Sequence, residues 1–220
     1  MSAHNSPKIL KLALCLFNDV TALDFQGPLE LFGFIARPNV IEAETLIKPV
    51  YLGPSPDPIK PWAGAPMIPT RTYDSVGEDE QFDIILIPGG ARPKATPQSL
   101  LSFIRRQAPG AKYVLSVCTG SWILAQAGVL HGKRATTNKA DFKTIRDTTT
   151  DLGITWVAKA RWVVDGNYWT SSGVTAGIDM ANAFLTHLIG EEPANQIRIL
   201  AEANVRGEGD DDFAEIYGLA

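Results

Sequence analysis

Apolar and amphipathic runs alternate along the chain, and this alternation predicts its elements. Mostly apolar runs, typical of buried strands, cover residues 9–17, 44–53, 82–90, 112–117, 155–166 and 168–172. Apolar residues at helical spacing cover residues 27–37, 97–107, 121–128 and 176–190. Strand-like and helix-like segments that alternate in this way predict an α/β fold, with helices covering a mostly parallel sheet.

Proline, glycine and charge mark the connections. The proline-rich stretch 54–69 predicts a surface connection with a short hairpin near its end. We find neither an internal repeat nor a linker that would separate a second domain. We therefore expect a single domain over residues 1–220, with a core at about 9–190 and a C-terminal segment at 191–220. The acidic stretch 207–213 within that segment is typical of a solvent-exposed tail.

The composition narrows the classes of partner. Hydrophobic residues make up 45% of the chain, charged residues 20%, and the net charge is −4, without a basic block. This balance argues against nucleic acid as a partner. No stretch approaches the roughly 18 apolar residues of a membrane span, and the N-terminal apolar run is too short for a signal peptide. We expect a cytoplasmic protein that contacts neither membrane nor nucleic acid.

The chain has only two cysteines and three histidines, which limits the disulfides and metal sites that it can form. Cys15 and Cys118 do not make a disulfide framework, which favours a reducing compartment. The histidines show no spacing typical of zinc ligands, so we expect no metal. Cys15 lies inside the first predicted strand, where a buried, unreactive thiol is the ordinary outcome.

Cys118 has a different setting, because an apolar strand ends just before it and a helix begins just after it. The small residues Ser116 and Gly120 flank it two positions away on each side. This spacing is typical of a sharp strand–turn–helix elbow that lifts a nucleophile out of a sheet. A thiol at a helix N-terminus is stabilised as thiolate, and ligands bind at the carboxyl end of parallel strands. We therefore interpret Cys118 as a candidate nucleophile.

The candidate proton-transfer group is Asp24. No histidine lies within ten residues of Cys118, so an adjacent Cys–His pair is not expected. Asp24 follows the first strand and stands between Leu23 and Phe25, where burying a carboxyl is unfavourable unless it has a purpose. The alternative is a carboxylate at a helix N-terminus, stabilised there by the helix dipole.

Two glycines after the strand at 82–90 form the third candidate feature. Gly89 and Gly90 permit positive φ and present unhindered N–H groups. The N–H groups of Gly90 and Thr119 are candidates to stabilise negative charge on a substrate, with Gly120 in the same turn. The alternative for Gly89 and Gly90 is a plain tight turn.

Together and in this order, four segments resemble the ThiJ/PfpI superfamily of the class I glutamine-amidotransferase-like fold: LDFQGP, DIILIPGG, VCTGSWILAQAGVLHGKRATT and SSGVTAGIDMA. The resemblance implies a flavodoxin-like three-layer sandwich and a homodimer. The C-T-G turn and L-D-x-x-G-P look most like the isonitrile hydratases of that superfamily. This likeness implies Cys118 as nucleophile, Asp24 as general acid/base and Thr119 as a hydrogen-bonding neighbour.

An isonitrile hydratase adds water to a small-molecule isonitrile through a cysteine thioimidate and releases an N-formamide, without a cofactor. Two alternatives stay open: a glyoxalase-like enzyme acting on 2-oxoaldehydes, and a redox sensor in which Cys118 oxidises. Glyoxalase-like relatives usually carry histidine where this chain has Thr119, and a sensor has no need of Asp24. Asn138 and Lys139 stand where hydratase-like relatives tend to have a histidine and an aromatic residue, which bears on the substrate.

Overall fold

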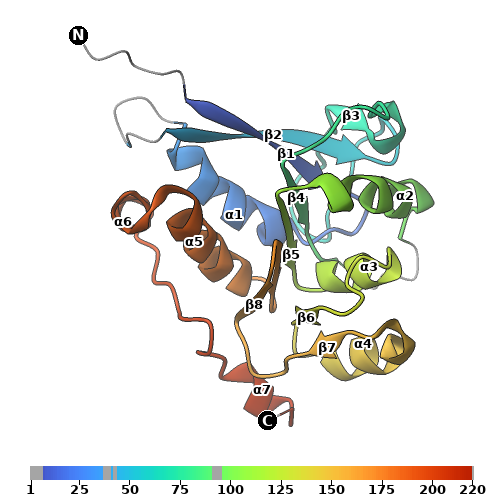
Figure 1. Ribbon diagram of the computed structural model, residues 1–220, viewed down its shortest axis with the longest axis vertical. Coiled ribbons are helices and arrows are strands. Elements are labelled where there is room, and N and C mark those ends of the chain that lie inside the picture. The colour runs from blue at the N-terminus through green and yellow to red at the C-terminus, as the bar shows by residue number, and fades with distance from the viewer. Residues whose placement is uncertain (1–6, 37–40, 42–43, 91–95, 220) are drawn as a thin grey trace.

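A seven-stranded sheet forms the centre of the protein (Figure 1). The computed structural model describes residues 7–36, 41, 44–90 and 96–219. The strands are β1 Lys8–Cys15, β2 Thr45–Gly53, β3 Arg71–Thr72, β4 Ile84–Ile87, β5 Tyr113–Val117, β8 Trp162–Asp165 and β9 Tyr168–Ser171. Their order is β3-β2-β1-β4-β5-β9-β8, and every pair is parallel except β8–β9. The central strands β4 and β5 are almost continuously apolar, as expected for strands covered on both faces.

Helices cover both faces of this sheet. The helices α1 Ala22–Phe34, α5 Ala176–Ile189 and α6 Glu191–Leu200 lie on one side, and α2 Gln98–Gln107 and α3 Gly120–Gln126 lie on the other (Figure 1). The buried apolar residues accordingly form two clusters, one containing Phe184 and the other Phe103. The flavodoxin-like, mostly parallel arrangement expected from the sequence is thus confirmed. None of the described helices has the length and apolar character needed to cross a bilayer.

The remaining elements lie beyond the β8–β9 edge of the sheet (Figure 1). A small two-stranded sheet pairs β6 Arg134–Ala135 with β7 Thr155–Trp156, and α4 Phe142–Thr148 lies between them in the chain. The last helix is α7 Phe213–Ile216. The hairpin expected around residues 65–73 lies earlier in the chain, because the antiparallel bridge joins Ile59 to Met67, whereas residues 71–72 form β3, parallel to β2.

Two element boundaries differ from the sequence prediction. The helix expected over 27–37 begins at Ala22, and Pro28 lies inside it. An interior proline loses a backbone hydrogen bond and crowds the carbonyl four residues earlier, which is why the sequence favoured a helix that starts near Pro28; the structure shows that α1 accommodates it. The strand expected over 155–166 is split into β7 and β8, because the Arg161 N–H between them donates to the Glu208 carbonyl instead of to a strand.

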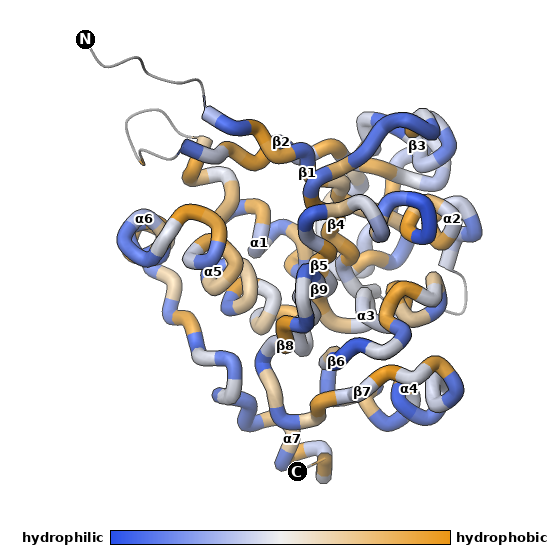
Figure 2. The backbone as a smooth tube through the Cα atoms, viewed as in Figure 1, coloured by the Kyte–Doolittle hydropathy of each residue, from blue (hydrophilic) through white to orange (hydrophobic). Residues whose placement is uncertain are grey.

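The acidic stretch 207–213 departs from the sequence prediction at one residue. Figure 2 colours much of the segment between α6 and α7 hydrophilic, and the residues of 207–213 other than Asp211 are exposed, as expected from their composition. Asp211 is only 3% exposed, and its carboxylate lies 2.9 Å from the Lys139 ammonium. The expectation of a solvated segment is therefore wrong for Asp211, which a buried cation holds inside the protein.

Candidate active site

Cys118 lies in a strained turn between β5 and α3. Its φ is +57°, a left-handed conformation that residues other than glycine rarely adopt. The turn is tight because Gly120 lies against the carbonyl oxygen of Ile87, where a Cβ atom would collide. The sharp, strained strand-to-helix turn predicted from the flanking small residues is therefore confirmed, and strain of this kind is typical of functional sites.

Hydrogen bonds hold both backbone polar groups of Cys118. Its N–H donates to the carbonyl oxygens of Ser171 and Ser172, at 3.2 and 3.0 Å. Its carbonyl oxygen accepts from the hydroxyls of Ser121 and Thr137, both at 3.1 Å. The strained conformation is thus fixed by contacts from both sides.

Asp24 lies in the first turn of α1, and its side chain is fully buried. Its Oδ2 accepts a hydrogen bond from the Gly89 N–H at 2.8 Å, and its Oδ1 has no hydrogen-bond partner among the described residues. Burial raises the pKa of Asp24 to about 7, and the Gly89 hydrogen bond offsets part of this rise. Near neutral pH this carboxyl can therefore both accept and donate a proton.

Gly89 is the point at which the candidate residues meet. A Cβ atom on Gly89 would lie 2.8 Å from Asp24 Oδ2, 2.8 Å from Cys118 Cβ and 2.7 Å from the Thr119 nitrogen. Any other residue would push these groups apart, so only glycine fits at this position without steric clash. The structure thus brings together Asp24, Gly89, Cys118 and Thr119, which the sequence places in three separate segments.

The N–H groups of Gly89 and Gly90 are engaged within the protein. Gly89 donates to Asp24, and Gly90 donates to Thr119 Oγ1 at 3.0 Å. The Thr119 hydroxyl in turn donates to the Gly90 carbonyl at 3.1 Å. These bonds position the carboxyl and the turn. A role of Gly89, Gly90 and Gly120 in stabilising charge on a substrate stays a prediction, and for Gly90 it requires exchange of the Thr119 bond.

The thiol of Cys118 is held in its protonated form. Burial, followed by the negative charge of Asp24, raises its pKa to about 12. The N–H groups of Thr119 and Val174 lower the pKa, but by less. The expected stabilisation of thiolate at the helix N-terminus is therefore outweighed by loss of solvation, and the expectation of a thiolate-favouring site is wrong. The resting pair is a neutral thiol beside a carboxyl.

Cys15 differs from Cys118 in access. It is fully buried at the end of β1, and burial raises the pKa of its thiol far above the ordinary value. Cys118 is partly exposed, and both cysteines are free. The expectation that Cys15 is a buried core thiol is confirmed.

Sequence reasoning assigned no contact to the loop that follows β6, although its ATT motif carries part of the resemblance. Thr137 from this loop donates to the Cys118 carbonyl, and Asn138 donates to Asp141 at 2.8 Å. The charge of Asp141 also contributes to the raised pKa of Cys118. This loop therefore adds a second carboxylate to the surroundings of the thiol.

A cavity of about 650 Å³ lies beside the start of α1, and Leu23, Gln26 and Ile178 line part of it. Neither Cys118 nor Asp24 lines this cavity. The predicted pocket shared by Cys118, Asp24 and Gly90 stays a prediction, since residues 91–95 lie outside the described part of the chain. Within that part, no group of three or more His, Cys, Asp or Glu is arranged to hold a metal ion.

Known proteins similar to this chain share both its sequence and its fold. The model of the DJ-1/PfpI family matches residues 10–187. Isonitrile hydratase of Pseudomonas putida is 36% identical over 195 residues, which are 88% of this chain and 78% of that protein. A deglycase of Pyrococcus horikoshii is 38% identical over 109 residues, 49% of this chain and 61% of its own. A solved ThiJ/PfpI family structure from Pseudomonas syringae superposes with a TM-score of 0.77 at 28% identity, covering 94% of this chain and 80% of the other.

Proposed function

Because the chain belongs to the DJ-1/PfpI family, we propose that it is a cysteine enzyme that hydrates an isonitrile to an N-formamide. The observation that carries the proposal is that Cys118, through its Cβ, and the Asp24 carboxyl both lie against Gly89, and that the Asp24 charge acts on the Cys118 thiol. Similarity to isonitrile hydratase over 88% of the chain supports the substrate class. Thr119, rather than histidine, follows the cysteine, so Asp24 is the group that moves protons.

The first step joins the thiol to the isonitrile. The terminal carbon of an isonitrile accepts both a proton and a nucleophile. Asp24, as carboxylate, removes the proton from the Cys118 sulfur and delivers it to this carbon while the S–C bond forms. The product is a thioimidate, R–N=CH–S–Cys118, which contains all atoms of the thiol and the isonitrile. A neutral thiol suits this step, because no free thiolate has to accumulate.

The second step hydrolyses the thioimidate. Asp24, again ionised, removes a proton from water as the oxygen adds to the thioimidate carbon, and passes this proton to the nitrogen, which gives R–NH–CH(OH)–S–Cys118. Asp24 then removes the hydroxyl proton as the C–S bond breaks, the sulfur takes this second proton from Asp24, and the N-formamide R–NH–CHO leaves. A carboxyl with a pKa of about 7 suits both proton transfers at neutral pH. One water supplies all the atoms that the isonitrile gains in the two steps, and the chemistry needs no metal or organic cofactor.

A second candidate is a cysteine enzyme acting on a reactive carbonyl such as a 2-oxoaldehyde. The partial match with a deglycase of the same family supports it. Against it stand the absence of a histidine after Cys118 in the sequence and the shorter stretch of similarity, 49% of the chain.

Parallel assays with two substrates test the proposal. Purified protein is incubated with a simple alkyl isonitrile or with methylglyoxal, and formamide and lactate are followed. We expect formamide from the wild type and from Cys15→Ala, and none from Cys118→Ala. Lactate without formamide would overturn the hydratase in favour of the second candidate. Circular dichroism of each variant checks that the fold is kept.

The proposal includes a cytoplasmic homodimer. Two free cysteines suit a reducing compartment, and Trp62 and Ile68, each 72% exposed, offer apolar surface to a second copy. Light scattering should give twice the chain mass of 23.8 kDa, and a monomer mass at micromolar concentration would contradict the dimer. Fractionation of the source cells checks the location.

A further inference from the structure

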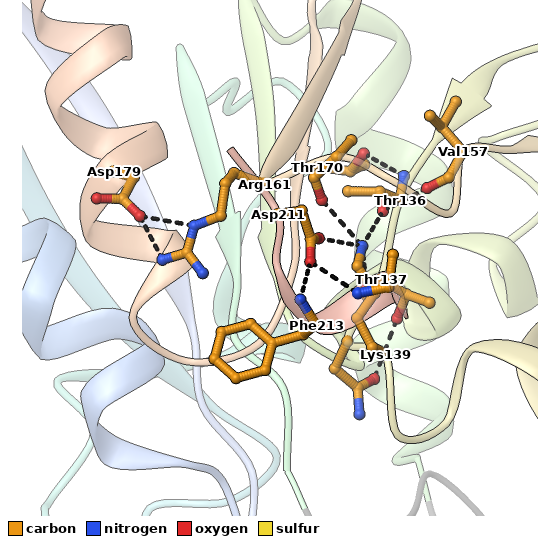
Figure 3. Close-up of polar contacts among 12 residues, drawn as sticks. Thr136, Thr137, Lys139, Val157, Arg161, Thr170, Asp179, Asp211 and Phe213 are labelled. Carbon is orange, nitrogen blue, oxygen red and sulfur yellow. Dashed lines mark hydrogen bonds and ion pairs between the residues drawn. The ribbon is translucent and has the colours of Figure 1, made fainter. Parts of the chain in front are cut away.

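The segment between α6 and α7 is bound to two loops that each connect to Cys118 by hydrogen bonds. Residues 206–213, here called the C-terminal strap, contact the loop of Lys139 through the buried Asp211 (Figure 3) and the loop of Arg161 through the Glu208 carbonyl. Asp211 of the strap pairs with Lys139, and the Glu208 carbonyl accepts from the Arg161 N–H at 2.7 Å. Lys139 and Arg161 lie far from residues 206–213 in the sequence, so the strap joins distant parts of the chain.

The first contact centres on the ammonium of Lys139. Besides the pair with Asp211, it donates to Thr136 Oγ1 at 3.1 Å and to the Ala160 carbonyl at 2.9 Å. The side chains of Lys139 and Asp211 are 2% and 0% exposed. The other Asp211 oxygen accepts from the N–H groups of Phe213 and Ala214. A charge pair this deeply buried holds its partners in one geometry, because separating them leaves a buried charge unpaired.

This contact reaches Cys118 through its carbonyl group. Lys139 lies two residues after Thr137, and its ammonium also lies 3.4 Å from the Thr137 carbonyl oxygen. The Thr137 hydroxyl donates to the Cys118 carbonyl at 3.1 Å. The strap therefore acts on the peptide group that follows Cys118 through one loop.

The second contact reaches Cys118 through its N–H group. Arg161, whose N–H donates to Glu208 of the strap, accepts from the Ser172 N–H at 2.8 Å. The Ser172 carbonyl accepts from the Cys118 N–H at 3.0 Å. The Arg161 guanidinium is held by Asp179 (Figure 3). Asp179 also accepts from the Arg206 N–H of the strap at 3.0 Å. The strap therefore acts on both peptide groups of Cys118.

Backbone strain persists only where the surroundings enforce it, and Cys118 has a φ of +57°. We propose that the C-terminal strap is a positioning device for Cys118, with Lys139 and Asp211 as positioning residues that hold the strained turn in its reactive orientation. The predicted effect on turnover rests on the proposed hydratase function. The predicted effect on the reactivity of the Cys118 thiol is independent of that function.

An exposed ion pair provides the matched control. Lys159 and Glu215 pair at 2.8 Å and connect the same two regions, the loop before Arg161 and the start of α7. Their side chains are 53% and 67% exposed, and an exposed pair contributes little to geometry or stability. Glu215→Gln thus removes a charge pair near the strap without touching the buried contacts.

The test compares Asp211→Asn with Glu215→Gln by the pH profile of iodoacetamide labelling at Cys118, read by peptide mass spectrometry. Asparagine keeps an acceptor for the Phe213 and Ala214 N–H groups and removes the pair with Lys139. We expect Asp211→Asn to loosen the turn, expose the thiol to water and label about tenfold faster, with the profile shifted to lower pH. The two carboxyls whose charges raise the pKa of Cys118, Asp24 and Asp141, are present in both variants, so their removal does not account for a shift. Glu215→Gln should match wild type.

Cys15 reports on unfolding in the same samples, because it is labelled only if the core opens. Equal Cys118 profiles for Asp211→Asn and wild type, with Cys15 protected, would overturn the proposal. If Asp211→Asn also labels Cys15, the double variant Lys139→Gln with Asp211→Asn decides, since it leaves no buried charge unpaired. A folded double variant with fast Cys118 labelling supports the strap; wild-type labelling, or loss of the fold again, assigns the pair to stability alone and overturns it.

Turnover gives a second readout. Misplacing a reacting group by about 1 Å lowers the rate by up to about 10²-fold, so kcat for the isonitrile should fall in Asp211→Asn while KM changes little. If the wild type turned over no isonitrile, the hydratase proposal would fail, and the labelling profiles would still decide the strap.

Discussion

Asp24 and Asp211 are both buried carboxyls, and they differ in what faces them. Asp211 lies against the Lys139 ammonium at 2.9 Å and caps the first N–H groups of α7. Asp24 accepts from one N–H group, that of Gly89, and interacts with the Cys118 thiol, and in the described part of the chain it has no cation as a partner. The pKa of Asp24 is accordingly raised to about 7, whereas Asp211 is an ion-pair partner.

The comparison separates two uses of a buried acid. With a cation beside it, as at Asp211, the carboxylate holds distant segments together, and its negative charge is balanced by the cation. Without a cation, the same group titrates near neutral pH, where a general acid and base is most effective. Removing or supplying the partner charge should therefore convert one kind of behaviour into the other.

The largest effect is expected from Asp24→Asn. An amide cannot exchange protons with the thiol or with water, so isonitrile turnover should fall by about 10²–10⁴-fold. Alkylation of Cys118 should instead become faster, because removal of the Asp24 charge lowers the pKa of the thiol. Formamide production and iodoacetamide labelling are measured on the same sample.

Asp19→Asn is the control for this variant, since Asp19 lies in the turn just before α1 and asparagine tolerates its φ of +64°. It should match wild type in both assays. Undiminished turnover by Asp24→Asn would remove Asp24 from the mechanism.

Lys139→Met should turn Asp211 into an unpaired acid like Asp24. Losing one member of a buried pair is expected to lower the free energy of unfolding by about 3–5 kcal/mol at pH 7. The loss should be smaller at pH 5, because protonation then neutralises Asp211. Urea denaturation at the two pH values measures this. Equal losses at both would show that Asp211 does not gain the behaviour of an unpaired carboxyl.

The pH dependence of stability should identify Asp24 in the wild type. Its pKa is raised from 3.8 to about 7 on folding, so the native state binds the proton more tightly than the unfolded chain. This contribution is complete below about pH 4 and is lost as the pH rises through 7, by at most about 4 kcal/mol. Asp24→Asn should flatten the curve between pH 4 and 7 in urea denaturation. The same slope in the variant would assign the dependence to other groups.

The smallest effect is expected from Thr119→Ala. The hydroxyl of Thr119 pins Gly90 by accepting from its N–H and donating to its carbonyl, but the Thr119 N–H stays in place. We expect roughly a tenfold loss of kcat/KM, as for one lost hydrogen bond. Thr119→Ser keeps the hydroxyl and should retain activity in the formamide assay. A loss as large as that of Asp24→Asn would give Thr119 a direct part in proton transfer.

The fold was predictable from the sequence because its signals are local. The continuous apolar runs at β4 and β5 are typical only of strands covered on both faces. The turn at Cys118 was predictable for the same reason, since Ser116 and Gly120 stand beside it in the chain. The start of α1 was not, because Pro28 marks a helix start in most sequences and lies in mid-helix here.

What the sequence could not supply depends on contacts between distant residues. Asp211 stands among other aspartates and has the local appearance of a solvated tail, and only the folded chain brings Lys139 to it. The protonation state of Cys118 likewise follows from burial and from Asp24, neither of which its neighbours in the chain reveal. Local patterns thus indicated the candidate reacting groups, and the three-dimensional structure was needed to predict their protonation states.

The most direct test of the central claim, that Cys118 and Asp24 form a reacting pair, is mass spectrometry of protein quenched in acid during turnover. The thioimidate should add the mass of the whole isonitrile to Cys118, because the thiol proton moves to the substrate carbon and is not lost. Peptide mapping should find this adduct on Cys118 in the wild type, never on Cys15, and in none of the peptides of Cys118→Ala. Formamide produced at the wild-type rate by Cys118→Ala, or an adduct confined to another residue, would contradict the account.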